Sequence, residues 1–305
     1  MPLSIGTAAQ NWNTEHLSLW DPATDTFGPG VQGRLKRIDP FVSLWHRSSR
    51  RMNAFFQPGT DTSTWAVIRQ DITGVIFLLS ATQEQDAWQG GPVYAEMRRC
   101  AKVMPPSGGK GLYTPVTVSG SGDNLGPVVM GPDVVVYLDV ERSGSGEPRE
   151  TVDTVEQEVY VFCSINASPQ EGDFLTLNGR PYRVDEAYFD TGFQCTKTVQ
   201  AAPAYTTVVI SFPGAAAPVY DPSTGGFTTG TWEERQVSVL TDESENVGRP
   251  TDRDLEEAQT LYIYTRHIGF SPLPGMQVEI GDRKWRVTRV DSNLEGKQWK
   301  VRIEP

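Results

Sequence analysis

The side chains with the most reactive chemistry are few in this 305-residue chain, and they are widely spaced. The three histidines and three cysteines are His16, His46, His267, Cys100, Cys163 and Cys195. The histidines form neither an HxH nor an HExxH spacing, so the pattern does not predict a metal site. The cysteines form no CxxC pair and lie in or beside expected strands, which is typical of buried free thiols.

Motifs for covalent and phosphate chemistry do not occur either. The sequence contains no GxSxG nucleophile elbow and no GxxxxGK phosphate loop followed by Ser or Thr. The segment SGGKG at 107–111 lacks that spacing and the hydroxyl residue, which indicates a linker. Paired carboxylates could hydrolyse a glycoside, but the acids here cluster in polar segments that flank no evident apolar cleft. We therefore expect no enzyme activity, no metal and no cofactor.

The composition indicates a globular, turn-rich and acidic chain. Hydrophobic residues make up 38% and charged residues 21%, with 29 glycines and 22 prolines. No run approaches the roughly 18 apolar residues of a membrane-spanning helix, and the N-terminal segment does not resemble a secretory signal. We expect synthesis in the cytosol. The net charge of −11 opposes a dedicated nucleic-acid binder, which would present a basic face.

One basic segment, residues 34–51, stands out against this acidic composition. Asp39 is its single acid, and its basic residues are Arg34, Lys36, Arg37, Arg47, Arg50 and Arg51. Two interpretations are open for such a segment. It is either a solvated strand face and loop, or a patch that docks on an acidic neighbour or faces DNA.

An internal repeat organises the elements of the chain. SPQEGDFLTLNGRPYRV at 168–184 matches SPLPGMQVEIGDRKWRV at 271–287 without a gap. Apolar residues alternate around Asn178-Gly179 and Gly281-Asp282, so each copy predicts a β-hairpin with a tight turn. Gly172 and Gly275 are expected at an earlier turn of each copy. The expected core residues of the hairpins are Leu175, Leu177, Tyr182, Val184, Val278, Ile280, Trp285 and Val287.

The repeat extends upstream and has a third, more divergent copy near the N-terminus. VYVF at 159–162 corresponds to LYIY at 261–264, and Tyr137-Leu138 falls on Val239-Leu240, both at an offset of 102. WDPATDTF at 20–27 matches YDPSTGGF at 220–227, and ITGVIFLL at 72–79 aligns with LNGRPYRV. Self-similarity at a fixed period is the signature of a repeat architecture.

The local patterns predict strands throughout. Runs of four to eight β-branched and aromatic residues are bounded by Gly, Pro, Ser or Asp, and helix signals are weak. Residues 96–104 are the best helix candidate, but the repeat makes them the closing strand of the first copy. We predict a mainly β chain of three tandem small β-barrel or β-sandwich domains with long inserted loops, at 1–106, 112–204 and 205–305.

Two of the inserted segments are long and acidic. Residues 139–158 and 242–257 each contain seven acids and two arginines, with glycine and proline in the middle. Long connections of this kind tend to be functional, and disorder is the alternative. We expect them to be assembly arms, with Glu147, Pro148, Arg149, Arg249 and Pro250 as candidate contact residues.

The chain resembles the small β-barrel head-closure and connector proteins of tailed bacteriophages. The resemblance lies in the YDPSTG opening at 220–225 and in the Gly172-Asp173, Asn178-Gly179 and Tyr182-Arg183-Val184 pattern with its second copy. The chain is about three times the usual size of that family, and Met276 replaces the aspartate that follows the glycine.

The resemblance implies a homo-oligomeric ring in the neck of the virion, assembled in the cytoplasm of the bacterial host. Its partners would be the portal or adaptor protein and tail tube, terminator, sheath or collar proteins. DNA would pass through the channel without sequence-specific binding, and no membrane would be involved. The alternatives are a tail terminator, a baseplate or tail-hub component, or a host-recognition protein that binds carbohydrate. Eight tryptophans could stack on sugars, but Trp285 and Trp20 occupy the repeat positions of Tyr182 and Tyr220, which favours core and hinge roles.

Overall fold

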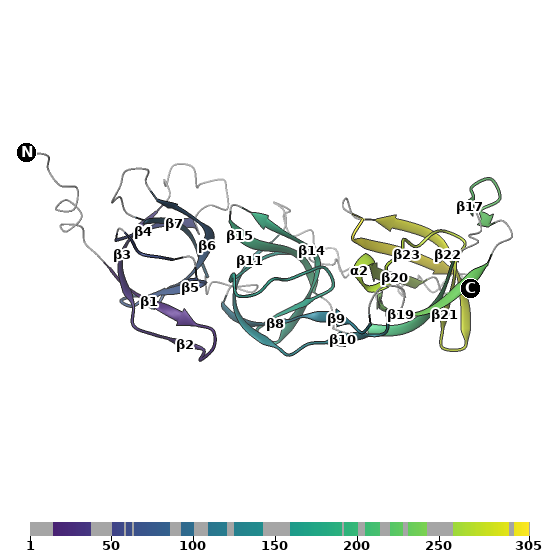
Figure 1. Ribbon diagram of the computed structural model, residues 1–305, viewed down its shortest axis with the longest axis horizontal. Helices are drawn as coiled ribbons and strands as arrows, with labels where there is room; N and C mark the ends of the chain where they lie inside the picture. The colour runs from purple at the N-terminus through teal and green to yellow at the C-terminus, as the bar shows by residue number, and fades with distance from the viewer. Residues whose placement is uncertain are drawn as a thin grey trace, which may run out of the picture. The chain divides into compact units, whose positions relative to one another are not determined.

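The computed structural model describes residues 15–37, 51–57, 59–62, 64–85, 93–100, 109–120, 125–142, 159–190, 192–200, 205–213, 220–227, 231–242, 259–292 and 296–304. Nearly all of the regular structure in these residues is β-strand, and it forms three closed six-stranded barrels, which can be followed by their colours in Figure 1. This confirms the predicted mainly β chain of three tandem small domains and decides between barrel and sandwich.

The first barrel has the order β1-β3-β4-β7-β6-β5 and closes through pairing of β1 with β5. Its strands are β1 (Glu15–Asp21), β3 (Val31–Arg37), β4 (Arg51–Phe56), β5 (Val67–Gln70), β6 (Ile76–Gln85) and β7 (Val93–Arg99). A two-residue strand, β2 (Thr26–Phe27), pairs with the end of β1. The expected closing strand of the first copy is β7, the sixth barrel strand.

The second and third barrels have the orders β8-β11-β12-β15-β14-β13 and β16-β19-β20-β23-β22-β21. The second is built from β8 (Gly109–Thr114), β11 (Val134–Arg142), β12 (Val159–Cys163), β13 (Phe174–Leu177), β14 (Arg180–Asp190) and β15 (Phe193–Gln200). The third is built from β16 (Tyr205–Pro213), β19 (Trp232–Asp242), β20 (Gln259–Tyr264), β21 (Gln277–Ile280), β22 (Arg283–Ser292) and β23 (Gln298–Glu304). A four-residue helix, α2 (Thr265–Ile268), follows β20.

All three barrels share one topology. In each, the barrel strands run around the wall in the order first, second, third, sixth, fifth, fourth. The fifth strand also has a register shift in each, at Leu79/Gln83, Val184/Glu186 and Val287/Arg289. Such bulges increase twist and bend the strand, as barrel closure requires. The divergent first copy is therefore a true structural repeat of the other two.

Each barrel also carries a small hairpin between its first and second strands. We call this hairpin its arm; it is distinct from the acidic segments 139–158 and 242–257. The first arm is residues 20–27 with β2, and the third arm is residues 220–227 with β17 (Tyr220–Asp221) and β18 (Gly226–Phe227). The described parts of the second arm are residues 116–120 and 125–130, with β9 (Val116–Val118) and β10 (Val128–Met130). The chain forms two compact units, of which one holds the first two barrels and the other holds the third barrel together with the second arm.

The two repeat hairpins use different tight turns. Asn178 and Gly179 both have positive φ, 53° and 75°, which matches a type I′ turn. In the other copy Gly281 has a φ of 60° and Asp282 does not share the left-handed conformation, which is the pattern of a type II′ turn. Gly172 and Gly275 have φ of 89° and 90° and donate to the carbonyls of equivalent valines.

The strand register corrects two details of the repeat alignment. On the third strand, counting from the equivalent residues Val184 and Val287 through the sixth strand places Val159 at the position of Gln259 instead of Leu261.

The second correction concerns the second strand. Tyr113 pairs with Leu175 and Val134, and Ile210 pairs with the equivalent Val278 and with Arg235. Counting along the second strand from these pairs places Tyr137 at the position of Ser238, one residue away from the alignment on Val239. A one-residue shift moves a side chain to the other face of the sheet, so the corrected register decides which residues point outward.

The register also explains why Met276 stands where the related copy has an aspartate. In the second barrel Asp173 is buried and accepts a hydrogen bond from the Tyr113 hydroxyl at 2.9 Å. In the third barrel Ile210 replaces that tyrosine, and Met276 is buried in the core cluster. A hydrogen-bonded pair is thus exchanged for an apolar pair, which leaves no polar group without its partner.

Candidate functional site

The first arm has a fixed local shape that depends on Asp21. The Asp21 carboxylate accepts hydrogen bonds from the backbone N–H of Ala23 at 2.9 Å and from the Thr24 hydroxyl at 2.8 Å. The Thr24 bond is the largest cause of a lowered Asp21 pKa, because both bonds favour the ionised form. Asp25 completes the turn with a positive φ of 54°. The WDPATDTF motif therefore encodes a preformed hairpin.

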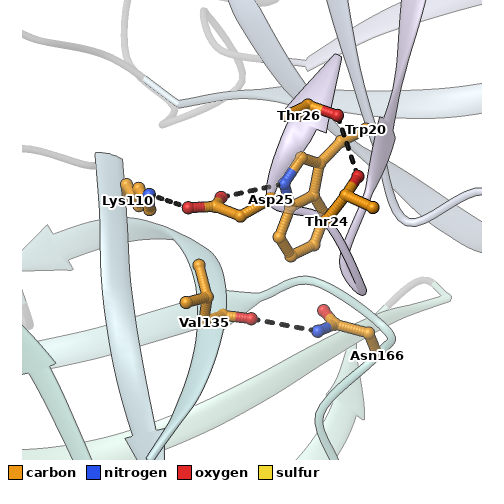
Figure 2. A network of polar contacts seen from close by, with 7 residues as sticks. All are labelled: Trp20, Thr24, Asp25, Thr26, Lys110, Val135 and Asn166. Atoms are coloured by element: carbon orange, nitrogen blue, oxygen red, sulfur yellow. Dashed lines mark hydrogen bonds and ion pairs between the residues drawn. The ribbon is translucent and has the colours of Figure 1, made fainter. Parts of the chain in front are cut away.

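This arm reaches from the first barrel to the second. The Trp20 and Phe27 rings lie edge-on to the Tyr137 ring of β11, with centroids 5.0 Å and 6.0 Å away. Asp25 forms an ion pair with Lys110 of β8 and accepts a hydrogen bond from the Trp20 indole N–H at 3.3 Å. Figure 2 shows the Lys110, Asp25 and Trp20 chain of contacts. The Lys110 bond is the largest cause of the lowered Asp25 pKa.

An apolar cluster continues this contact between the two barrels. Trp20 and Tyr137 are only 5% and 6% exposed. Burial is the main cause of the raised Tyr137 pKa. The buried members of the cluster are Trp20, Ala66, Val67, Leu78, Cys100, Tyr137, Phe162, Phe193 and Cys195. Because residues of both barrels form it, the cluster joins them by the same apolar burial that stabilises a core.

A buried ion pair lies at the same junction. The Arg98 Nε of β7 donates to Asp139 Oδ2 of β11 at 2.5 Å, and the two side chains are 2% and 0% exposed. The Arg98 guanidinium also lies over the Phe162 ring, 3.4 Å from its centroid. Charges buried this deeply are costly unless they are paired with good geometry. The pair takes one residue from each barrel, so it forms only when these two faces meet.

The second arm packs on the third barrel. The Val128 backbone N–H donates to the Ser238 hydroxyl of β19 at 2.9 Å. The Arg266 guanidinium of α2 donates to the Val116 carbonyl at 3.0 Å. Figure 1 shows β9 and β10 beside β19. The second arm, like the first, thus ends on the second strand of a following barrel.

The third arm repeats the local shape of the first. Tyr220 pairs with Phe227 as Trp20 pairs with Phe27. The Asp221 carboxylate accepts bonds from the N–H and hydroxyl of Ser223 at 2.9 Å and 2.6 Å, which lower its pKa. Gly225 has a φ of 63° at the position of Asp25. Its carbonyl accepts a bond from Arg286 of the same barrel at 2.6 Å.

His267 lies beside the second arm's contact and is 1% exposed. The rings of Tyr205 and Tyr264 surround it, with centroids 5.8 Å and 5.5 Å away. Neither ring nitrogen has a hydrogen-bond partner among the residues that the structure describes. Burial, together with a smaller effect of the neighbouring Arg266, lowers the His267 pKa to about 3. His267 is therefore a neutral packing residue.

The predicted hairpin core residues lie in the barrel interiors. Leu175, Leu177, Tyr182 and Val184 are buried in the second barrel, and Val278, Trp285 and Val287 are buried in the third. Ile280 is half-buried and packs against the third core. These residues stabilise the barrels and do not meet at one common site.

The other predicted contact residues are not brought together in the described structure. Glu147, Pro148, Arg149, Arg249 and Pro250 lie outside the described residues, as do Arg47 and Arg50. Arg34 is exposed on β3, which also contains Lys36 and Arg37, and Arg51 begins β4. The basic segment thus remains a predicted docking patch.

The described residues contain buried thiols but no candidate metal site. Cys100, Cys163 and Cys195 are free and buried, as the sequence predicts. No three His, Cys, Asp or Glu side chains within the described ranges come close enough to hold a metal ion. Trp20 and Trp285 are buried, whereas Trp232 is 39% exposed. Within the same ranges, no helix has the length and apolar character needed to cross a bilayer.

The fold and the junctions define a tandem β-barrel repeat protein whose barrels are linked by docking arms. Comparison of the chain with known protein families, with curated proteins and with solved structures finds no match in any of the three.

Two features of the junction were missed by sequence reasoning. The WDPATDTF motif marks the start of a copy, but nothing local shows that its aromatics dock on another barrel. Arg98 and Asp139 are 41 residues apart in two different barrels. Only their positions in strands that otherwise alternate apolar and polar residues could have indicated burial.

Proposed function

We propose that this chain is a structural assembly protein without catalytic activity, and that it forms an oligomeric ring in the neck of a tailed bacteriophage. There it would join the portal or adaptor to the tail and surround the DNA channel. The observation that carries the assembly role is the arm: a hairpin with a fixed turn lies on the second strand of the second barrel, and a second hairpin lies on the second strand of the third barrel.

The physical properties of the arms support this role. A hairpin with a rigid turn, buried aromatics and a few polar contacts loses little conformational entropy when it docks. Closed barrels expose no long strand edge, so association must use arms and loops instead of edge pairing. The neck location rests on the family resemblance at residues 168–184, 220–225 and 271–287.

Localisation within the virion tests the proposal. We would fuse a small epitope tag to the C-terminus of the full chain in the phage that encodes it, and label particles with gold-conjugated antibody. Labelling at the head–tail junction is expected. Label at the distal tip of the tail would instead favour a baseplate or tail-hub component. Absence of the protein from purified particles by mass spectrometry would contradict a virion role altogether.

Binding assays separate the structural proposal from its carbohydrate alternative. Purified full-length protein is expected to bind the portal or a tail protein in pull-down experiments and to give no signal on a glycan array. Saturable binding to a defined glycan, lost on replacement of the exposed Trp232 by Ala, would favour host recognition.

A further inference from the structure

The three arms are equivalent elements, because each lies between the first and second strands of its barrel. For two of them the structure gives the docking contact. The first arm places Trp20 and Phe27 on Tyr137, and the second places the Val128 backbone on Ser238. By strand register, Tyr137 and Ser238 are the same position of the barrel. Docking thus follows one rule: an arm binds the outer face of the next barrel's second strand.

The third arm is shaped to follow this rule. Its strand pairing, its aspartate-capped turn and its left-handed residue match those of the first arm. The tip residues Pro222, Ser223 and Thr224 are exposed. The third arm therefore has the same local shape as the arm that docks on the second barrel.

The first barrel has a matching face. On β3, Val31 and Leu35 pack against the core. Gln32 and Arg34 lie between them at alternate positions and therefore point outward. Ile68 pairs with Phe77 and Leu19 as Leu175 pairs with Tyr182 and Tyr113. Counting along β3 from this register places Gln32 at the position of Tyr137 and Ser238, and Gln32 is exposed.

The polar residues of this arm and this face also correspond. In the first arm Asp25 forms an ion pair with Lys110, which is paired across the sheet with Tyr137. The third arm has Gly225 in place of Asp25. The first barrel has His16 in place of Lys110, because His16 is the residue paired with Gln32. The third arm thus lacks the carboxylate of Asp25, and the face of the first barrel lacks the lysine that would pair with it.

We infer that the third arm, residues 220–227, docks on β3 of the first barrel of a second copy of this chain, with Tyr220 against the outer face at Gln32. This inference rests on the proposed assembly role and specifies the contact between two copies of the chain. The contact is head-to-tail, so repetition builds either a closed ring or an open filament. The surface that the arm offers and the surface that receives it are different, which allows each copy to use both at once.

Cysteine crosslinking tests the contact directly. Full-length Thr224→Cys protein and full-length Gln32→Cys protein, carrying different tags, would be mixed and treated with a short bis-maleimide. The native cysteines Cys100, Cys163 and Cys195 are buried, so they should react little in the folded protein. We expect a dimer that carries both tags. The matched control replaces Thr224→Cys by Ser271→Cys, an exposed position of the third barrel outside the arm, and should give no such dimer.

Single substitutions test the energetics of the same contact by mass photometry and light scattering of the full chain. Tyr220→Ala and Gln32→Glu are each expected to weaken self-association at least about tenfold, since a truncated aromatic anchor and a charge buried without a partner have effects of this size. Gln32→Glu would place a carboxylate against the Tyr220 ring. Tyr188→Ala and Gln277→Glu are the matched controls at exposed positions of the second and third barrels, and should leave association unchanged.

The outcomes separate this inference from the proposed function. Neck labelling together with no mixed-tag dimer, or with unchanged association of Tyr220→Ala and Gln32→Glu, overturns the inference and leaves the proposed function standing. A mixed-tag dimer with no protein in the virion supports the contact and overturns the neck role. A chain that stays monomeric at all concentrations and gives no crosslink overturns the inference. If Tyr220→Ala misfolds, Gln32→Glu on the opposite surface still decides the question.

Discussion

Arg98 and Asp139 form the most deeply buried charge pair of the junction between the first two barrels. Arg98→Met alone would leave the Asp139 carboxylate buried without its cation. We expect this variant to lower the free energy of unfolding by about 3 to 5 kcal/mol. Urea titration followed by intrinsic fluorescence would measure the change.

The double variant Arg98→Met with Asp139→Leu is the control for this prediction. It removes both charges and keeps apolar volume, so it should recover much of the loss and can match the wild type. A double-mutant cycle with a coupling energy near zero would contradict an energetic link between the two residues.

His267 should make the stability of the third barrel depend on pH. Its pKa is lowered from 6.5 to about 3 in the folded state, mainly by burial. The unfolded chain therefore takes up a proton as pH falls below 6.5, while the folded chain does not do so until about pH 3. Stability is fully present above pH 6.5, and its loss between pH 7 and pH 5 should reach about 2 kcal/mol.

The matched control for this pH dependence is His267→Phe, which keeps a ring between Tyr205 and Tyr264 but cannot be protonated. Chemical unfolding of both proteins at several pH values would isolate the histidine contribution as the difference between their slopes. Parallel stability curves from pH 7 to pH 5 would show that His267 is protonated equally in both states.

At the scale of the element, each repeat hairpin places an aromatic residue of its second strand in the barrel core. Tyr182 and Trp285 are both 4% exposed and belong to separate cores. Replacing either by Ala should destabilise its barrel by about 3 to 5 kcal/mol. Trp285→Phe should cost less, because the Trp285 indole N–H has no partner within the described residues. Thermal unfolding followed by circular dichroism would rank the three variants.

At the scale of the whole molecule, the acidic segments should serve assembly and not folding. Deletion of residues 143–151 or 244–251 leaves β11, β12, β19 and β20 intact, and the closure entropy of a connection depends only weakly on its length. We expect soluble, folded subunits that fail to enter particles. Particle yield and the melting temperature of each deletion protein would be measured together. A normal yield, or an unfolded subunit, would contradict this role.

The turn of an arm can be recognised in the sequence, but the surface on which the arm docks cannot. The pairs 20–27 and 220–227 are recognisable in sequence, because proline, aspartate and a left-handed residue impose one local turn wherever they occur. The surface on which each arm docks is not local. Trp20 meets Tyr137 across 117 positions of sequence, and Val128 meets Ser238 across 110.

The sequence by itself determined the repeat, the strand-rich class and the two tight turns, because alternation and positive-φ residues are properties of a few neighbouring positions. It placed Tyr137 one residue away from its structural equivalent, since weakly similar strands align almost as well after a small shift. Only the tertiary structure decided the register of Tyr137 with Ser238, the burial of Arg98 with Asp139 and the docking of the arms. Those features depend on which strands pair and which faces meet, and such long-range contacts leave no periodic signal in the chain.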